Sequence, residues 1–227
     1  MPTLAWLKRE FNYGYDSGNV LSRIPNLRRW REQKVCGGSY RRVFLEGVLP
    51  YLRPDANVLE LGPGRGSWSR AILQHLPRGQ LQTVDFQDVS QWLMPAKWSG
   101  RLICHQVNDN SLRGTPDQHF DLFWSFGVLC HNNNDAILEI LTSALPKMKP
   151  GGYAVHQFGD WKKLDAFGWE RGHIPVEFKQ KPDDEIWWPR NDQDAMRRVA
   201  TSAGWRMVSS DLGLLRRDAI MVLQAPL

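Results

Sequence analysis

The sequence lacks the features that define membrane-spanning, secreted and repeat proteins. No stretch approaches the roughly 20 uninterrupted apolar residues that a membrane-spanning helix needs. No internal repeat or low-complexity tract occurs in the 227 residues. The start, MPTLAWLKREFNYGYDSG, has neither the apolar centre nor the small-residue cleavage site of a signal peptide. We therefore expect a soluble, cytoplasmic protein without membrane partners.

Cysteine is scarce as well. Cys36, Cys104 and Cys130 have no CxxC spacing and no cluster of histidines beside them. This pattern favours reduced thiols over a disulfide framework or a zinc site. We assign these cysteines no chemistry.

Positive charge is present only in modest excess, and it is unevenly distributed. The net charge is +5, and residues 1–50 account for all of it, with nine Lys or Arg against four Asp or Glu. Such a segment is either a solvated helical face or a surface that meets phosphate or another anion. We favour the solvated face.

The length and the 42% hydrophobic content suit one substantial core. Short apolar runs alternate with helical patterns after Pro54. The strand candidates are residues 57–61, 80–86, 101–107, 120–127, 152–159, 205–210 and 219–225, and the helical patterns are 67–76, 135–148 and 192–204. This alternation predicts an α/β fold: a Rossmann-like, seven-stranded, mostly parallel sheet with helices on both faces. Only eight residues separate the last two strands, so the last strand is expected to be antiparallel.

Two segments flank or interrupt this pattern. Residues 1–52 are expected to form an N-terminal helical lid, with helical pieces broken at Pro25 and at Gly37-Gly38. Residues 53–227 then form the main domain, in which 161–190 is too long for an ordinary connection. We interpret 161–190 as an aromatic cap insertion after strand five.

The stretch NVLELGPGRGSW (57–68) places Gly62, Gly64 and Gly66 between the first strand and a helix. In an open parallel sheet this turn forms the floor of the ligand site. A dinucleotide fingerprint needs a further glycine at position 67, which is serine, a candidate N-cap. Glu60 would repel a pyrophosphate but suits a ligand with an ammonium group beside a carboxylate, such as the methionine end of S-adenosylmethionine.

The ends of the next two strands add matching groups. Asp85 follows the second strand, where an acid can accept hydrogen bonds from both ribose hydroxyls; its alternative role is a helix cap. Asp109, in VNDN with Asn108, is placed for an adenine amino group, or else it is a solvated loop acid. Phe86 and Val107 would border the adenine.

At this point the chain resembles the class I S-adenosylmethionine-dependent methyltransferases. The resemblance rests on VLELGPGRG, Asp85, VND, FDLFWSFGVLCH and LPKMKPGGYAVHQF, and covers residues 40–160 best. It implies S-adenosyl-L-methionine as the cofactor. The predicted cofactor-binding residues are Glu60, Gly62, Gly64, Gly66, Asp85, Phe86, Asn108, Asp109 and Ser125.

Methyl transfer from a sulfonium mainly requires alignment and desolvation of the nucleophile, plus a base if the nucleophile must lose a proton. His131, just past the fourth strand, and Asp160, at the end of the fifth, are the predicted catalytic residues; Asp160 would orient His131 or bind a substrate hydroxyl. The alternative for His131 is a hydrogen bond to loop backbone. Asp109, Asp135 and Asp160 offer oxygen atoms, but their spacing is not that of a metal site, so no metal is expected.

The cap supplies the predicted substrate-binding residues Trp161, Trp169, His173 and Trp188, because aromatic rings suit stacking on a sugar or an aromatic substrate. The alternative is that these rings only attach the insertion to the body. Tyr13, Tyr15 or Tyr40 of the lid would reach the cofactor carboxylate or the substrate.

The preferred function is O-methylation of a small molecule such as a sugar or natural-product hydroxyl. The fourth motif departs from the NPPY type seen in many amino-group methylating enzymes of DNA and protein, which argues against the exocyclic amine of a base as the methylated group. The alternative is an RNA-directed methyltransferase or RNA-binding protein that uses the basic N-terminal segment. A relative of the fold without catalysis, and a homodimer, stay open.

Overall fold

The computed structural model describes residues 16–227, and Tyr13 and Tyr15 lie outside this range. Seven strands form one sheet in the order β3-β2-β1-β4-β5-β7-β6. They are β1 (Asn57–Leu61), β2 (Gln80–Asp85), β3 (Leu102–Gln106), β4 (Phe120–Ser125), β5 (Met148–Gly159), β6 (Arg206–Ser209) and β7 (Asp218–Gln224). Strands β1 to β5 pair in parallel, whereas β7 is antiparallel to both β5 and β6. The predicted α/β sheet and its antiparallel last strand are confirmed.

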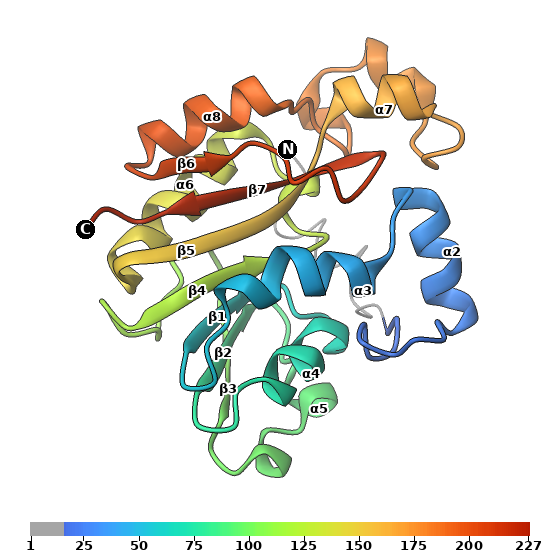
Figure 1. Cartoon of the computed structure of the whole chain (residues 1–227). Coiled ribbons are helices and arrows are strands. Elements are labelled where there is room, and N and C mark those ends of the chain that lie inside the picture. Colours follow the sequence, from blue (N-terminus) through green and yellow to red (C-terminus); the bar gives the residue numbers. More distant parts are fainter. Residues whose placement is uncertain (1–15) are drawn as a thin grey trace.

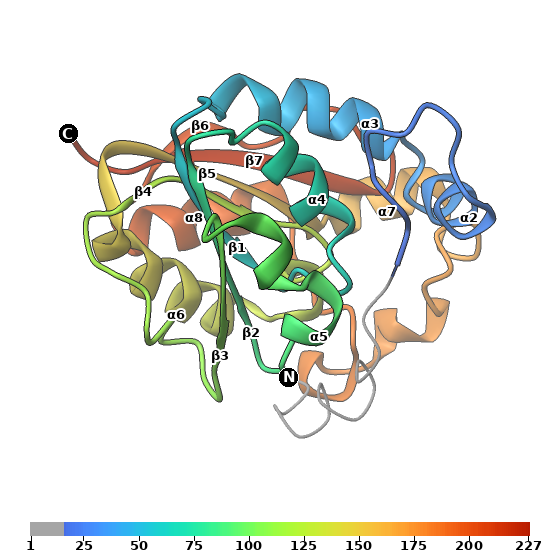
Figure 2. The ribbon, with the colours of Figure 1, turned by 90° about the horizontal axis from the view of Figure 1, so that it is seen from below.

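Helices cover both faces of this sheet (Figure 1). They are α2 (Leu27–Cys36), α3 (Tyr40–Val43), α4 (Ser67–Gln74), α5 (Ser90–Leu93), α6 (Asn134–Ala144), α7 (Trp161–Phe167) and α8 (Gln193–Ser202). A π turn at Phe44–Val48 and a 3-10 turn at Leu49–Tyr51 continue α3. Figure 2 shows α4 and α5 on one side of β1 and β2, and α6 on the other.

The alternation of side chains along the central strands explains the two layers. Val58 and Leu59 of β1 are neighbours, yet they belong to different clusters of buried apolar side chains. Val58 packs in the cluster that holds the α3 and α4 residues, and Leu59 in the cluster that holds the α6 and α8 residues. Successive side chains of a strand point to opposite faces, so a strand buried on both sides is apolar throughout.

The predicted breaks in the N-terminal helices lie where expected. Helix α2 begins after Pro25, and the Asn26 side chain caps it by accepting from the N–H of Arg29. Gly37 ends α2 with φ 70°, a conformation that favours glycine. The predicted helix over 135–148 is shorter than expected: α6 ends at Ala144, a 3-10 turn contains Pro146, and β5 begins at Met148. A proline inside a helix removes a backbone donor and clashes with the preceding turn, which explains the early end.

Candidate active site

The glycine-rich turn lies at the carboxyl end of β1, where the strand order reverses between β1 and β4. Ligands of open α/β sheets bind at this switch point. Gly62, Gly64 and Gly66 all have positive φ (66°, 55° and 80°). A Cβ on Gly62 would lie 2.4 Å from Val128 Cγ2, and one on Gly66 would lie 2.3 Å from Leu93 Cδ2. The turn therefore needs glycine at these positions for both conformation and space.

The predicted helix cap at Ser67 is wrong. Gly66 is the residue that precedes α4, and it provides no side-chain cap. The Ser67 hydroxyl instead accepts from the backbone N–H of Ser17 at 2.9 Å, and the N–H of Val20 donates to the Ser67 carbonyl. Asp16 also pairs with Arg70 of α4 at 2.8 Å. The start of the described N-terminal segment therefore runs along the first turn of α4, beside the glycine-rich turn.

Glu60 is buried beside this turn, with 2% of its surface exposed. Its Oε2 accepts from the Ser69 hydroxyl at 2.5 Å. Burial, with a smaller contribution from the nearby Asp85 carboxylate, raises the pKa of Glu60 to about 8. A cation beside Glu60 would stabilise its ionised form, as expected for a group that receives an ammonium.

Asp85 ends β2 and faces the same turn. Its Oδ1 accepts from the Gln87 N–H at 2.9 Å, and its carboxylate also accepts from the backbone of Phe86 and Gly64. Burial raises its pKa to about 6 although these hydrogen bonds favour the ionised form. The bond to Gly64 joins the end of β2 to the glycine-rich turn, so the two predicted motifs form one structural unit.

The other predicted cofactor residues lie at the ends of β3 and β4. Phe86 is partly exposed, and Asn108 and Asp109 are exposed after β3. The Asp109 carboxylate accepts from the N–H (3.0 Å) and hydroxyl (2.5 Å) of Ser111, which is the arrangement of a loop-stabilising acid. Ser125 is fully buried at the end of β4, and its Oγ lies 2.8 Å from Nδ1 of His156. The adenine-side role of these residues stays a prediction.

His131 lies in the 3-10 turn Leu129–His131 that follows β4, against the cap. Its Nδ1 lies 2.8 Å from the Trp187 carbonyl oxygen. A carbonyl only accepts, so Nδ1 carries the proton and the lone pair is on Nε2. Burial lowers the pKa of His131 to about 4, and the imidazole is therefore neutral near pH 7. The rings of Trp187 and Trp188 lie 6.0 and 5.4 Å from the imidazole.

Asp160 does not orient His131, contrary to that part of the prediction. It is the N-cap of α7, where Oδ1 accepts from the N–H groups of Lys162 and Lys163 at 3.0 and 3.2 Å. Its Oδ2 accepts from the Gln193 side chain at 3.0 Å. Both oxygens of this fully buried carboxylate are thus bonded to protein donors. The Trp187 carbonyl orients His131 instead.

The cap over 161–190 has a small core of its own. Trp169 and Trp188 are buried in it with Leu164, Ile174 and Phe178, and Trp161 packs against its edge. The Trp161 and Trp169 rings meet edge to face at 4.6 Å, and Trp169 Nε1 donates to Asp165. These contacts match the alternative in which the rings hold the insertion together. A role for Trp161, Trp169 and Trp188 in substrate binding stays a prediction.

Two further predicted residues lie away from the glycine-rich turn or deep in the core. Tyr40 is buried between Trp68 and Phe126, and its hydroxyl lies 3.7 Å from Cys36 Sγ. His173 is exposed and lines a pocket with residues of α2 and the β6–β7 loop; that pocket contains none of the predicted cofactor residues.

A buried ion pair that we did not predict supports the cap. The Arg217 guanidinium donates to both oxygens of Asp218 at 2.7 and 2.8 Å, and also to the Gly172 carbonyl at 2.9 Å. It lies 4.6 Å from the Trp188 ring centroid, and the charges of both partners influence the pKa of His131. A sequence signal existed, because two opposite charges, Arg217 and Asp218, stand where the apolar strand β7 begins, but the other partners of Arg217 come from distant segments.

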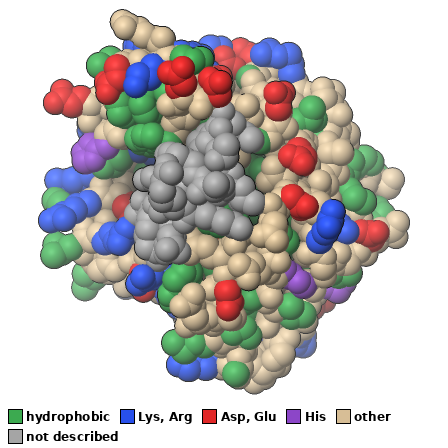
Figure 3. All heavy atoms as spheres, turned by 180° about the vertical axis from the view of Figure 1, so that it is seen from behind, with side chains coloured by type: hydrophobic (Ala, Val, Ile, Leu, Met, Phe, Trp, Pro, Cys, Tyr) green, Lys and Arg blue, Asp and Glu red, His purple; other side chains and the backbone are tan. Residues whose placement is uncertain are grey.

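The basic N-terminal residues divide between surface and interior. Arg28 and Arg42 are exposed and pair with Glu32 and Glu46, four residues further on. Arg29 is buried and donates to the carbonyl oxygens of Asn19 and Ser22. Figure 3 shows acidic as well as basic side chains on one face of the molecule, so no continuous basic surface covers it.

Within residues 16–227, no group of three or more His, Cys, Asp or Glu side chains is arranged to hold a metal ion. In the same range, no helix combines the length and apolarity needed to cross a membrane.

Comparison with known proteins identifies the family. Residues 27–210 match the family model described as a methyltransferase domain, and the chain belongs to this family. The family model and the fold are those of S-adenosylmethionine-dependent methyltransferases, the class that the resemblance implied. No curated protein sequence matches the chain.

Solved structures share the fold at low sequence identity. The pyocyanin biosynthetic protein PhzM has 13% identity and a TM-score of 0.60, over 81% of this chain and 53% of that one. The 1,6-didemethyltoxoflavin-N1-methyltransferase of Burkholderia thailandensis, with S-adenosylhomocysteine bound, has 15% identity and a TM-score of 0.57, over 87% and 79%. An O-methyltransferase from neocarzinostatin biosynthesis, in complex with S-adenosylmethionine and a naphthoic acid, has 13% identity and a TM-score of 0.56, over 75% and 49%. The chain spans about half the length of the first and third of these proteins.

Proposed function

We propose that Glu60 and the Gly62–Gly66 turn bind the methionine end of S-adenosylmethionine, and that Asp85 binds its ribose. Two buried carboxylates with raised pKa values, Glu60 and Asp85, face one glycine-rich turn. An ammonium group and a pair of hydroxyl donors would stabilise their ionised forms. Asn108, Asp109, Phe86 and Ser125 are the proposed residues toward the adenine. When bound, this cofactor supplies an electrophilic methyl group on a sulfonium.

We propose that the acceptor is a hydroxyl group of a small molecule. The observation that carries this proposal is the neutral His131 imidazole, whose Nδ1 proton is held by the Trp187 carbonyl. Its Nε2 is the atom that would accept the hydroxyl proton as the oxygen attacks the methyl carbon. The sulfur leaves as a neutral thioether, so no acid is needed on the leaving side.

The chemistry of the surroundings also supports an aromatic or sugar acceptor. The apolar faces of Trp187 and Trp188 flank His131, so a flat or cyclic substrate beside it would lose water on binding. One similar structure is an O-methyltransferase with a hydroxylated naphthoic acid, and another is an N-methyltransferase. The fold alone does not choose between these atoms, and the choice of oxygen rests on His131.

Transfer of a labelled methyl group tests this function. S-adenosylmethionine labelled on its methyl group is incubated with phenols, glycosides and matched amines. We expect label on oxygen acceptors and its loss in His131→Asn, while S-adenosylhomocysteine binding persists. Labelling of amines alone, with His131→Asn fully active, would contradict O-methylation.

The RNA-directed alternative has less support. Of the basic N-terminal side chains, Arg29 is engaged inside the protein and Arg28 and Arg42 pair with acids. Cytoplasmic location and the homodimer remain predictions from the sequence.

A further inference from the structure

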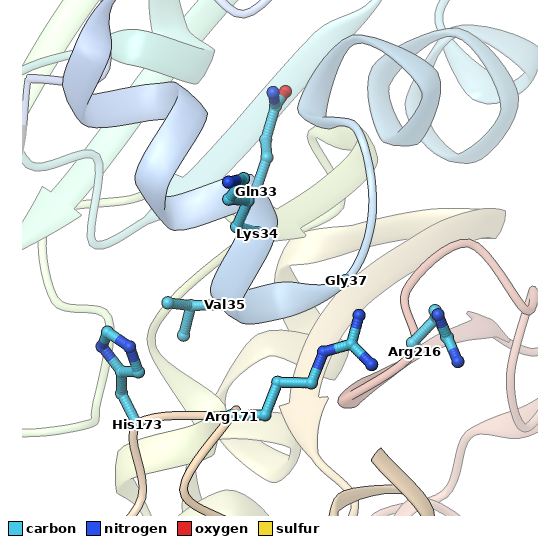
Figure 4. Close-up of a pocket in the computed structure, with 7 residues that line it drawn as sticks. All are labelled: Gln33, Lys34, Val35, Gly37, Arg171, His173 and Arg216. Atoms are coloured by element: carbon cyan, nitrogen blue, oxygen red, sulfur yellow. The ribbon is translucent and has the colours of Figure 1, made fainter. Parts of the chain in front are cut away.

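A second pocket, of about 510 Å³, lies between α2, the loop around residues 168–173 and the loop between β6 and β7. Figure 4 shows its lining: Gln33, Lys34, Val35 and Gly37 at the end of α2, Arg171 and His173 from the cap, and Arg216 from the β6–β7 loop. Four of these seven residues are Lys, Arg or His, and none is acidic. The pocket is therefore positively charged and concave.

Arg171 and Arg216 both lie near the aromatic ring of Phe167. The Arg171 guanidinium carbon lies 4.5 Å from the Phe167 ring centroid, and that of Arg216 lies 5.6 Å from the same centroid. Phe167 is buried, so this ring is a fixed support for both side chains. Cation–π contact orients each guanidinium against this ring.

No acid in the described residues neutralises this pair. Among residues 16–227, neither Arg171 nor Arg216 forms a salt bridge, and Lys34 forms none either; its ammonium instead lies 3.8 Å from the Trp30 ring centroid. The carbonyl oxygens at the end of α2 are also occupied. The Cys36 carbonyl accepts the N–H groups of Arg216 and Arg217 at 3.2 and 3.1 Å. The positive charge of the pocket is thus left without a compensating group from the protein.

Close packing at Gly37 fixes how α2 lies against the cap and the β6–β7 loop. A Cβ on Gly37 would lie 2.6 Å from Arg216 Cβ and 2.9 Å from Phe167 Cε2, so α2 packs directly on the two cap and loop segments. Gln33 is held in place, because its Oε1 accepts from the Tyr40 N–H at 2.9 Å. The segments that carry the lining residues are therefore packed against one another, while the side chains of Arg171, His173 and Arg216 are exposed.

We propose that this pocket binds a phosphate or pyrophosphate group carried by a small molecule. Guanidinium groups donate in a planar fork that matches the oxygens of phosphate, and a bound dianion would supply the counter-charge that residues 16–227 do not give to Arg171 and Arg216. The volume is in the range of small-molecule sites. A pocket of this size accepts one phosphorylated compound rather than the extended backbone of a nucleic acid. The site is independent of the proposed methyl acceptor, and its residues differ from those around His131 and Glu60.

Titration calorimetry at constant ionic strength tests the proposal, with sodium pyrophosphate, inorganic phosphate and a sugar phosphate as ligands and sodium chloride as the reference. We expect saturable binding of at least one phosphate compound at a stoichiometry of one. The double variant Arg171→Gln/Arg216→Gln should weaken this binding about tenfold or more. The control Arg198→Gln removes one charge from exposed α8 and should leave the binding unchanged.

A second measurement does not depend on finding the preferred ligand. Without phosphate, the double variant should unfold at about the same urea concentration as the unaltered chain, because both arginines are exposed and neither forms a salt bridge among residues 16–227. Equal phosphate binding by the double variant would overturn the proposal. So would a weaker response to pyrophosphate than to single-stranded RNA, since that pattern indicates a general polyanion surface. None of these readouts requires methyl transfer, so they separate this site from the proposed function.

Discussion

The Ser69 hydroxyl of α4 donates to the Glu60 carboxylate of β1 at 2.5 Å, and this bond fastens the helix to the strand directly behind the glycine-rich turn. Within residues 16–227, Glu60 has no cationic partner at hydrogen-bond distance, and burial is the largest influence on its pKa. Because Glu60 is buried, its ionisation in the free protein destabilises the folded state. The same property prepares Glu60 to receive a positive charge.

Replacing Glu60 with Gln should therefore stabilise the free protein at alkaline pH. Folding raises the pKa of Glu60 from 4.5 to about 8, so its stabilising contribution is complete below about pH 4.5 and is lost as the pH rises toward 8. We expect the free energy of unfolding of Glu60→Gln, relative to the unaltered chain, to increase by up to about 1.4 kcal/mol per pH unit across that interval. Urea unfolding at pH 5.5 and 8.5 measures this difference. An unchanged difference at the two pH values would contradict the burial argument.

The same residue should release a proton when the cofactor binds. An ammonium beside Glu60 favours its ionised form, so binding near pH 7 expels the proton that burial retained. Calorimetric titration with S-adenosylhomocysteine in two buffers of different ionisation enthalpy measures this release. We expect a clear difference between buffers for the unaltered chain and a much smaller one for Glu60→Gln, together with weaker binding.

The raised pKa of Asp85 predicts that cofactor affinity depends on pH below neutrality. Its pKa is raised to about 6, and only the ionised carboxylate accepts two hydroxyl hydrogen bonds. The protonation of Asp85 alone should lower the affinity for S-adenosylhomocysteine about tenfold from pH 7 to pH 5, in addition to the fall that the proton release from Glu60 causes over the same interval. Asp85→Asn should bind more weakly at pH 7 and show a flatter profile. A profile identical to that of the unaltered chain would remove Asp85 from the binding site.

Gly62 is expected to tolerate no side chain. Alanine at Gly62 combines a positive φ of 66° with a Cβ 2.4 Å from Val128 Cγ2, so Val128 and the following turn that carries His131 must shift. Gly100 has a similar φ of 79° and no atom within 4 Å of its added Cβ, which makes Gly100→Ala the matched control for backbone strain alone. We expect Gly62→Ala to lose cofactor binding and about 2–4 kcal/mol of stability, and Gly100→Ala to lose about 1 kcal/mol with binding intact.

His131→Asn tests the proposed base. Asparagine retains a donor for the Trp187 carbonyl but offers no basic nitrogen, so a purely structural role would be largely preserved. We expect kcat to fall about 10²–10⁴-fold with little change in cofactor affinity. Because the pKa of His131 is lowered to about 4, its ionisation should leave the activity of the unaltered chain flat between pH 6 and 8. Activity that rises through pH 6.5 with His131 would contradict the neutral-imidazole model.

The sequence predicted the sheet and the glycine-rich turn because both depend on local patterns. Apolar runs of strand length and three glycines at fixed spacing specify β1 and its turn almost without reference to the rest of the chain. The role of Asp160 could not be predicted from local patterns of this kind. Asp160 was placed correctly at the end of β5, but its role follows from the next seven residues forming α7, for which an aspartate is a favourable cap.

The contacts of the cap and the pocket beside α2 could not be predicted from local patterns for a different reason. The pairing of His131 with the Trp187 carbonyl, and the meeting of Lys34, Arg171 and Arg216, join segments far apart in the chain. The aromatic residues of 161–190 were recognised as one unit. Whether they faced substrate or each other depended on packing that no spacing rule encodes.

The Arg217–Asp218 pair is expected to be the most sensitive point of the cap. Asp218 is fully buried, and Arg217 joins β7 to the Gly172 carbonyl and to the Trp188 ring. Asp218→Asn leaves a buried guanidinium without its counter-charge, and we expect a loss of about 3–5 kcal/mol in urea unfolding. The exposed pair Arg42–Glu46 provides the control, since Glu46→Gln should leave the urea midpoint nearly unchanged. Tryptophan fluorescence follows the same titration. A loss no larger than that of Glu46→Gln would mean that Arg217 is not buried with Asp218 in solution.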